Sequence, residues 1–244
     1  MKSGITSLLT GLSMVLVSCL GAVPAGAAPA VGSFTNGTFA NVSGLYSDNG
    51  LGYETLRDGS TDISGWKVAG AVDWINTYWK APGGNSIDLN GDGVGGVSQT
   101  FDTIIGATYD VSFWLAGNFD LGSTSNRWTA MVWTLRPGNV KYFTVTEPDT
   151  WSHQAMGFQL EHYVFTAKST STTLMFFGDP ETRVWGPVIA DVSVTVGAQC
   201  KNDGWQSLIN PITGAAFANQ GQCVSYFAKA GYVPIGSSKS SWQN

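Results

Sequence analysis

The densest group of residues with binding chemistry is the segment from Asp73 to Trp79, which sets aromatic rings among polar side chains. Sugars expose apolar C–H faces that can stack on flat rings, and their hydroxyls form hydrogen bonds with carboxylates and amides. In this interpretation Trp74, Tyr78 and Trp79 would stack on a ligand, while Asp73 and Asn76 would bind its hydroxyls. The alternative is packing, because aromatic residues also dominate the cores of β-sandwiches. The sequence supports the two interpretations about equally.

Catalytic arrangements are less well supported. A glycoside hydrolase needs two carboxylates that face each other across a cleft. Six acidic residues could supply such a pair, namely Asp73, Asp88, Asp92, Asp110, Asp120 and Glu161. The sequence alone brings no two of them together. A Ser–His–Asp site would need His153 or His162, and no G-x-S-x-G motif accompanies either histidine. We expect His153 in a loop and His162 on the outward face of a strand, both solvated, and the sequence therefore predicts a protein that is not an enzyme.

One segment matches the start of a calcium-binding loop: Asp88-x-Asn90-x-Asp92-Gly93. The twelfth position of such a loop should be a bidentate glutamate, and here it is Gln99. We interpret this segment as a turn between two strands. The sequence therefore predicts no metal site and no cofactor.

Period-two alternation of apolar and polar residues runs through most of the chain. It predicts strands near residues 66–68, 72–75, 86–89, 97–101, 109–115, 127–135, 141–145, 161–167, 172–177 and 188–196. The region from Val31 to Ser64 is mostly turn chemistry, although Phe34 and Phe39 are expected to anchor a first strand. No long stretch has a helical period. Short strands joined by Gly, Asn and Asp turns predict an antiparallel β-sandwich over residues 31–196.

The N-terminus has the features of a secretory signal peptide: Lys2, a short apolar run and the A-x-A site at Ala25 to Ala27. We expect cleavage after Ala27, which gives a signal peptide of residues 1–27 and a secreted or cell-wall-associated protein. The alternative is a lipoprotein anchored through Cys19, because Leu16 to Cys19 resembles a lipoprotein box. No other segment is long and apolar enough to span a bilayer.

The net charge limits the classes of ligand, and the cysteines predict a disulfide. Without Lys2 the formal net charge goes from −5 to −6, which excludes nucleic acid as a natural ligand. Few charges and many aromatic residues suit a neutral polysaccharide. Cys200 and Cys223 form an even pair that predicts a disulfide in an exported protein. They lie in a compositionally distinct segment, residues 199–233, which we expect to be a small stapled appendage with a helical turn near 222–229. A Ser-rich tail, residues 234–244, is expected to be disordered.

Eight short motifs in order resemble the choice-of-anchor C family of exported bacterial proteins, which is similar to a domain of unknown function in plant cell-wall proteins. They are NGTF, GW, VDWI, SIDLNG, GGVSQTF, YDVSFWLAGN, FTAKSTSTTLMF and GPVIADVSV, between residues 36 and 194. The resemblance implies a galactose-binding-like jelly roll, a cell-surface or cell-wall setting and carbohydrate binding. It does not imply an enzyme. Related domains often bind a structural calcium, but Ala40 and Ala190 stand where its carboxylates are expected, so we expect none.

The C-terminal segment CKNDGW…NQGQCVSY resembles a segment of exported actinobacterial proteins, and it has no LPxTG sorting motif. The sequence thus leaves two main hypotheses. The first is a non-catalytic module that binds a cell-wall glycan. The second is a structural or adhesion protein that contacts other envelope proteins without a sugar ligand. A glycoside hydrolase is the weakest alternative.

Overall fold

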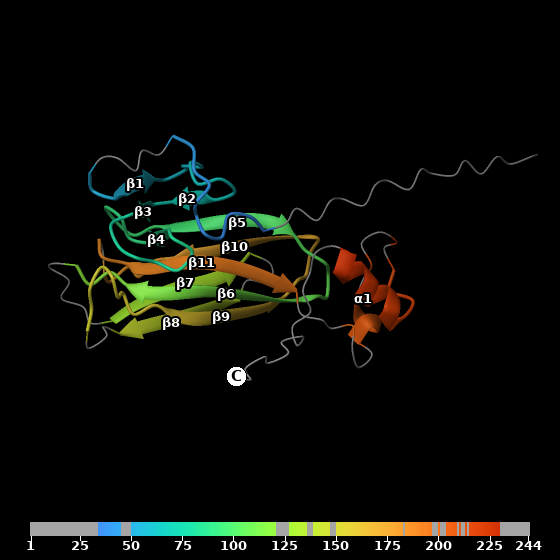
Figure 1. The fold of residues 1–244 in the computed structure, drawn as a ribbon. Coiled ribbons are helices and arrows are strands. Elements are labelled where there is room, and N and C mark those ends of the chain that lie inside the picture. The colour runs from blue at the N-terminus through green and yellow to red at the C-terminus, as the bar shows by residue number, and fades with distance from the viewer. Residues whose placement is uncertain are drawn as a thin grey trace, which may run out of the picture.

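The computed structural model describes residues 34–44, 50–120, 127–135, 139–146, 150–182, 184–196, 200, 204–208, 210, 213 and 215–229. Within these ranges the chain forms two antiparallel sheets that pack face to face (Figure 1), so the predicted β-sandwich is confirmed. The strands are β1 Tyr53–Arg57, β2 Lys67–Ala69, β3 Ala71–Ile75, β4 Ser86–Asp88, β5 Gly96–Asp102, β6 Thr108–Gly117, β7 Arg127–Thr134, β8 Val140–Thr146, β9 Gln159–Thr166, β10 Ser171–Phe177 and β11 Pro187–Val196. The predicted signal peptide and C-terminal tail lie outside the described residues.

The strand order defines the topology. One sheet has the order β1-β3-β4-β11-β6-β9, and the other has the order β2-β5-β10-β7-β8. From β4 to β11 the chain passes between the sheets in the pattern of an eight-stranded jelly roll, 4-11-6-9 over 5-10-7-8. The jelly roll implied by the family resemblance is therefore confirmed, with β1, β2 and β3 added at one side.

The core lies between the two sheets and follows the predicted alternation. In β6, Tyr109, Val111 and Phe113 are all buried, while the residues between them face outward. In β7 the core side is formed by Trp128, Ala130, Val132 and Thr134, so Met131 and Trp133 lie on the outer face.

The alternation predicted for β11 is interrupted. The register against β6 shifts between Ala190 and Ser193, and Asp191 has a positive φ of 44°. This bulge changes which side chains face inward, so Ile189 and Val192 are both buried.

The N-terminal region departs from the sequence prediction. Phe34 and Phe39 do not anchor a strand. Phe39 has a φ of 56°, and its N–H donates to the carbonyl oxygen of Asn36 at 3.0 Å in a tight turn. Its buried ring packs against Trp66 with a centroid distance of 5.2 Å, so it closes the core at one edge. The first strand is instead β1, which pairs with β3 in a region where turn residues dominate the sequence.

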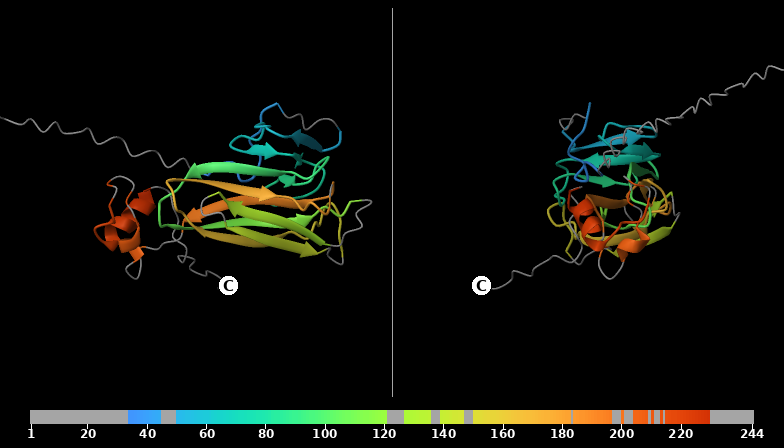
Figure 2. Two further views of the ribbon diagram at one scale, coloured as in Figure 1. Left: turned by 180° about the vertical axis from the view of Figure 1, so that it is seen from behind. Right: turned by 90° about the vertical axis from the view of Figure 1, so that its right-hand side faces the viewer.

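The C-terminal segment lies at one end of the sandwich (Figures 1 and 2). It contains a 3-10 helix, η1 Gly204–Ser207, and a helix, α1 Gln220–Lys229, and the predicted disulfide between Cys200 and Cys223 is confirmed. Buried residues of this segment belong to the same hydrophobic cluster as the sandwich core. Across the helices that the structure describes, none has the length and apolar character needed to cross a membrane.

Candidate functional site

The outer face of the six-stranded sheet carries a row of side chains that changes from polar to apolar. Cross-strand pairing joins Thr55 to Asp73, Asp73 to Asp88, Asp88 to Val188 and Val188 to Ala116. Residues paired in this way point to the same face of a sheet. Two carboxylates from separate strands are thus brought side by side on one surface.

Two loops cover the apolar part of this face. The loop after β3 carries Tyr78 and Trp79, and the loop before β9 carries His153 and Met156. The loops are joined where the N–H of Lys80 donates to the carbonyl oxygen of His153 at 2.8 Å. Beneath them lies a second hydrophobic cluster, separate from the main core, formed by Ile75, Trp79, Ala116, Met156 and Val188. The polar part of the face stays open.

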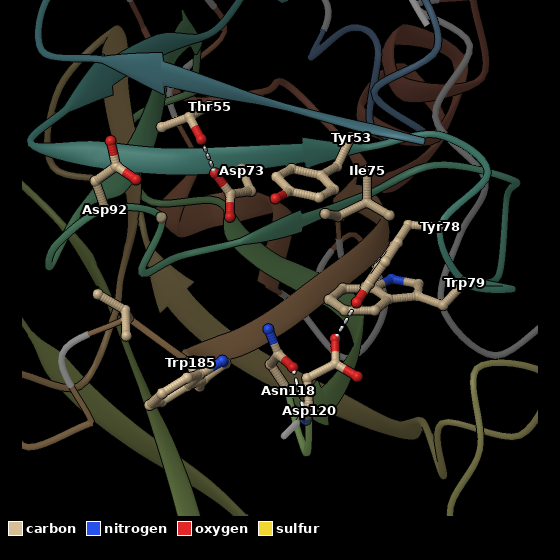
Figure 3. Close-up of a pocket in the computed structure, with 12 residues that line it drawn as sticks. Tyr53, Thr55, Asp73, Ile75, Tyr78, Trp79, Asp92, Asn118, Asp120 and Trp185 are labelled. Atoms are coloured by element: carbon tan, nitrogen blue, oxygen red, sulfur yellow. Dashed lines mark hydrogen bonds between the residues drawn. The ribbon is translucent and has the colours of Figure 1, made fainter. Parts of the chain in front are cut away.

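The open part forms a pocket of about 360 Å³, which we call the aspartate pocket (Figure 3). It is lined by Tyr53, Thr55, Asp73, Ile75, Tyr78, Trp79, Gly91, Asp92, Asn118, Asp120, Val184 and Trp185. Tyr53 and Asp73 reach it from β1 and β3, and Asn118 and Trp185 lie on the opposite side. Rings and carboxylates therefore surround one space.

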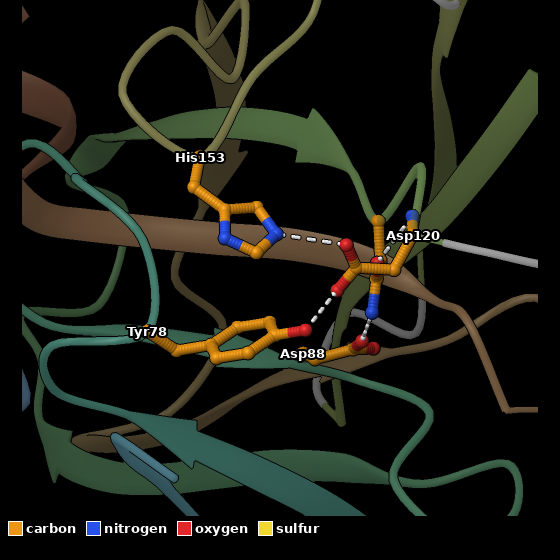
Figure 4. A network of polar contacts seen from close by, with 5 residues as sticks. Tyr78, Asp88, Asp120 and His153 are labelled. Atoms are coloured by element: carbon orange, nitrogen blue, oxygen red, sulfur yellow. Dashed lines mark hydrogen bonds and ion pairs between the residues drawn. The ribbon is translucent and has the colours of Figure 1, made fainter.

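A chain of hydrogen bonds fixes the wall of the pocket (Figure 4). The hydroxyl of Tyr78 donates to Oδ2 of Asp120 at 2.7 Å, and Nε2 of His153 lies 2.8 Å from Oδ1 of the same carboxylate. The N–H of Asp120 donates to Oδ1 of Asn118 at 3.0 Å. Asn118 in turn donates from Nδ2 to Oδ2 of Asp88 at 2.8 Å. The carboxylate of Asp120 at the pocket wall is thereby connected through Asn118 to the buried carboxylate of Asp88.

Burial distinguishes the carboxylates of this site. Asp88 is fully buried, and desolvation raises its pKa to about 8, although N–H groups of Asn118, Asn90 and Gly186 donate to it and oppose the rise. Desolvation also raises the pKa of Asp73, and the hydroxyl of Thr55, which donates to Oδ1 of Asp73 at 2.6 Å, opposes that rise. Burial therefore raises the pKa of both inner carboxylates, and the larger rise is that of Asp88.

Tyr78 is the ring most closely coupled to this network. Desolvation, together with the acceptor Asp120, raises its pKa to about 12. Its ring lies 5.3 Å from that of Tyr53 and 4.5 Å from that of His153, measured between centroids. Tyr78 is thus a neutral hydrogen-bond donor at neutral pH.

The structure divides the five residues of the predicted ligand-binding segment. Asp73, Tyr78 and Trp79 line the aspartate pocket. Trp79 is only 2% exposed, and its Nε1 donates to Oγ of Ser86 at 2.8 Å, so most of its ring is packed. Asn76 is half-buried and is not among the lining residues.

The stacking role predicted for Trp74 is wrong. Trp74 alternates with Asp73 and Ile75 along β3, so it points into the sandwich and not into the pocket. It is 3% exposed, and its Nε1 donates to the carbonyl oxygen of Phe39 at 2.9 Å. For this residue the packing alternative is correct.

Several pocket residues escaped the sequence analysis. Tyr53 and Thr55 could not be found because β1 was not recognised. Asn118 directly follows β6, and its position after a strand with clear alternation is the available signal. Asp120 is a sequence candidate only for a hydrolase carboxylate pair, and its place in this pocket is not predicted. Trp185 precedes β11 in a loop and had no signal in the local pattern.

The two histidines differ from each other. His162 is exposed on β9, as predicted, with Nδ1 3.0 Å from a carboxylate oxygen of Asp110. His153 lies in a loop, as predicted, but the prediction that it is simply solvated is wrong. Its side chain is 36% exposed and contacts both Asp120 and the ring of Tyr78.

The calcium-like segment forms a turn whose carboxylates are already engaged. Oδ1 of Asp88 accepts the N–H of Asn90 at 2.9 Å, and Asp92 pairs with Arg57. Asn90 and Val94 then form an isolated bridge that closes the turn. In the described part of the chain, no cluster of three or more His, Cys, Asp or Glu is arranged to hold a metal ion.

Comparison with known proteins places the chain in a family. Residues 32–195 match the family described as "Protein of unknown function (DUF642)". Because this match covers more than half of the chain, the protein belongs to that family. No curated protein matches the chain. The finer assignment to choice-of-anchor C proteins stays a prediction.

Solved structures resemble the chain only at low similarity. A structure described as "CBM4 structure and function" is 17% identical with a TM-score of 0.38, over 67% of this chain and 99% of that one. CBM35 from Paenibacillus barcinonensis is 16% identical with a TM-score of 0.38, over 58% of this chain and 98% of that one. The arabinose-bound MgGH51 α-L-arabinofuranosidase is 11% identical with a TM-score of 0.39, over 68% of this chain and 26% of that one. These scores are too low to support a function.

Proposed function

We propose that this protein is an exported, non-catalytic module that binds a neutral polysaccharide, such as a cell-wall glycan, in the aspartate pocket. The observation that carries the proposal is that aromatic rings and carboxylates surround one open pocket. Tyr53, Tyr78 and Trp185 supply partly exposed rings, and Asp73 and Asp120 supply acceptors. An anchor through Cys19 is the alternative to simple secretion.

The chemistry of the lining favours a ligand with many hydroxyls. Ionised carboxylates only accept hydrogen bonds, and O–H donors to them form strong, charge-assisted bonds. The rings would contact the apolar faces of the same sugars. An anionic glycan would be repelled by the carboxylates of Asp73 and Asp120, which line the pocket, while the third lining carboxylate, Asp92, is paired with Arg57. We therefore expect neutral glycans to be preferred over acidic ones.

Affinity electrophoresis of the purified protein tests this proposal. The gels would contain galactan, xylan, mannan, β-glucan or, as the acidic probe, polygalacturonate. Trp185→Ala should weaken binding to the preferred neutral glycan by about tenfold, which corresponds to 1.4 kcal/mol. Trp114→Ala is the matched control, because Trp114 is a half-buried tryptophan on the outer face of the same sheet that does not line the pocket.

Two results would contradict the proposal. One is wild-type binding by Trp185→Ala, and the other is a preference for polygalacturonate. Binding to purified envelope proteins that survives the pocket substitutions would support the adhesion hypothesis instead.

One observation favours a second candidate function, a glycoside hydrolase. Asp73, Asp92 and Asp120 line the same pocket, and the raised pKa of Asp73 suits a proton donor. Incubation of the protein with the same glycans, followed by measurement of reducing ends, tests this candidate. Release of reducing ends by the wild type, lost in Asp73→Asn and in Asp120→Asn, would make the pocket an active site. No release by the wild type would eliminate the hydrolase.

A further inference from the structure

A second and larger hollow lies on the outer face of the five-stranded sheet. Its volume is about 740 Å³. Outward side chains of β7 and β8 form its floor, among them Met131 and Tyr142, and residues 179–182 form a wall. We call this hollow the sheet-face groove. Among the residues that the structure describes, none lines both this groove and the aspartate pocket.

The floor continues as two cross-strand rows of large apolar side chains. In the first row Phe177 pairs with Met131, and Met131 pairs with Tyr142. In the second row the register continues from Met175 to Trp133 and then to Val140. Neighbouring strands lie about 4.8 Å apart, so each row extends roughly 10 Å from β10 to β8. These side chains thus form a platform across three strands.

Aromatic residues of the platform are accessible. Tyr142 is 64% exposed, and Trp133 and Phe177 are half-buried, with 6.1 Å between their ring centroids. The core packs against the opposite side of these strands, so the platform is not needed to fill the sandwich. Contiguous exposed apolar surfaces with a polar rim are typical of interaction sites and ligand-binding grooves.

Hydroxyls border the platform at both ends of the strands. Thr129 and Thr144 lie with their hydroxyl oxygens 3.1 Å apart, and Thr100 and Thr173 lie 2.8 Å apart. The platform therefore offers flat apolar surface next to polar atoms that can donate or accept hydrogen bonds. Sugar units present the same two features.

The charges of the groove do not select a charged ligand. Arg127 lies at the groove together with Asp179 and Glu181, so charges of both signs are present. A polyanion would meet two carboxylates, and a polycation would meet a guanidinium. A neutral ligand avoids both conflicts.

The wall of the groove is held from the inside of the protein. Nδ2 of Asn90 donates to the carbonyl oxygen of Asp179 at 2.7 Å and to Oγ1 of Thr182 at 3.0 Å. Farther along the same loop, Val184 and Trp185 line the aspartate pocket. One pinned loop thus borders both sites.

We propose that the sheet-face groove and the platform that continues its floor form a second glycan-binding site, in which a neutral polysaccharide chain lies across β10, β7 and β8. Its sugar units would stack on Trp133 and Tyr142, and its hydroxyls would reach Thr129 and Thr182. The class of ligand follows the proposed function, but the site uses different residues, so each site can bind whether or not the other does.

Hydroxyl-radical footprinting with mass spectrometry tests both sites in one sample, because the radicals oxidise exposed Met, Trp and Tyr side chains. The probes would be oligosaccharides of galactan, xylan, mannan and β-glucan. We expect a neutral oligosaccharide to protect Met131, Trp133 and Tyr142 from oxidation. Tyr142→Ala should weaken polysaccharide binding about tenfold when the aspartate pocket already carries Trp185→Ala. Leu160→Ala is the matched control, because it removes a similarly exposed apolar side chain from the edge strand of the other sheet.

The outcomes separate the two proposals. Protection at Tyr53, Tyr78 and Trp185 alone would overturn the second site and leave the proposed function standing. Protection at Met131 and Trp133 alone would support the groove and overturn the aspartate pocket. Protection at neither place by any probe would overturn both. Protection of the groove that rises with protein concentration without sugar would show that a second copy covers it, and it would overturn the glycan proposal.

Discussion

The outer faces of the two sheets are built from strands with the same alternation of side chains, but one face is partly covered by loops and the other is open. On the six-stranded sheet, two loops fold back over the face and bury a second hydrophobic cluster around Trp79. On the five-stranded sheet the corresponding rings stay accessible, as Tyr142 shows. The difference lies in the loops and not in the strands. An outward aromatic residue can therefore be a structural element on one face and a binding surface on the other.

A single glycine helps to set the covered face. The carbonyl oxygen of Gly52 accepts the N–H groups of Asn76, Thr77 and Tyr78 at 3.0 to 3.2 Å, which pins the loop after β3. Gly52 has a φ of 78°, and a Cβ at this position would lie 2.6 Å from the backbone nitrogen of Tyr78. Only glycine tolerates both the positive φ and this close approach. The position of Tyr78 in the aspartate pocket thus depends on a residue outside the pocket.

The largest effect that should separate the two faces is on stability. Trp79→Ala should lower the free energy of unfolding by about 3–5 kcal/mol, because it empties the cluster beneath the loops. Trp133→Ala should lower it by about 1 kcal/mol or less, because its ring lies on the open face. Urea denaturation of both variants measures the contrast. Equal decreases in the free energy of unfolding would show that the ring of Trp133 is packed as well. Because the decrease expected for Trp79→Ala is large, this variant is unsuitable as a test of binding.

The second effect is a pH dependence of the free energy of unfolding, and it comes from a carboxylate of the six-stranded sheet. The pKa of Asp88 is raised to about 8 in the fold, against 3.8 for an ordinary aspartate. Between these two pKa values the folded state keeps a proton on Asp88 that the unfolded state has lost. The contribution of this proton to the free energy of unfolding is therefore fully present below about pH 4 and decreases as the pH rises to about 8. Each pH unit within this window should remove up to about 1.4 kcal/mol.

Asp88→Asn should remove this decline, because the amide does not titrate. Urea denaturation at pH 4, 6 and 8 of the wild type and the variant gives the difference between the two slopes. A wild-type stability that rises as steeply as that of the variant between pH 4 and 8 would contradict the assignment.

The smallest effect tests the hydrogen-bond network at the pocket wall. Tyr78→Phe removes the bond to Asp120 while keeping the ring contacts with Tyr53 and His153. The free energy of unfolding should fall by about 1 kcal/mol, because the bond is partly exposed to solvent. Glycan binding should weaken if the hydroxyl also positions the Asp120 carboxylate. Tyr142→Phe on the open face is the matched control, and a stability loss there as large as in Tyr78→Phe would remove the contrast between the two faces.

The sandwich could be predicted because its signals are local. Alternation along β6 and β10 is a property of consecutive residues, and the turns between strands have a recognisable composition. Prediction failed where a residue took an unusual backbone conformation. Phe39 has a positive φ and closes the core at one edge, and Asp191 has a positive φ at the bulge in β11. Neither conformation is visible in residue type, since both residues usually adopt negative φ values.

The candidate site could be predicted only in part. Asp73, Tyr78 and Trp79 were found because they cluster in the sequence, and the same cluster wrongly included Trp74 as a stacking ring. Alternation along β3 sends Trp74 to the core, but the sequence did not reveal which set of residues faces outward, since both sets contain apolar side chains.

By itself, the sequence determined the β-sandwich, the disulfide between Cys200 and Cys223, and the aromatic and acidic character of the segment from Asp73 to Trp79. Only the tertiary structure decided which of these side chains meet. Asp73 lies beside Asp88 because β3 pairs with β4, and Asp120 meets Tyr78 and His153 because two loops close over one sheet. Strand pairing and loop packing act between residues far apart in the chain, so residue types and spacing do not encode them locally. The arrangement of the site therefore depends on the tertiary structure, while the types of side chain that form it are given by the sequence.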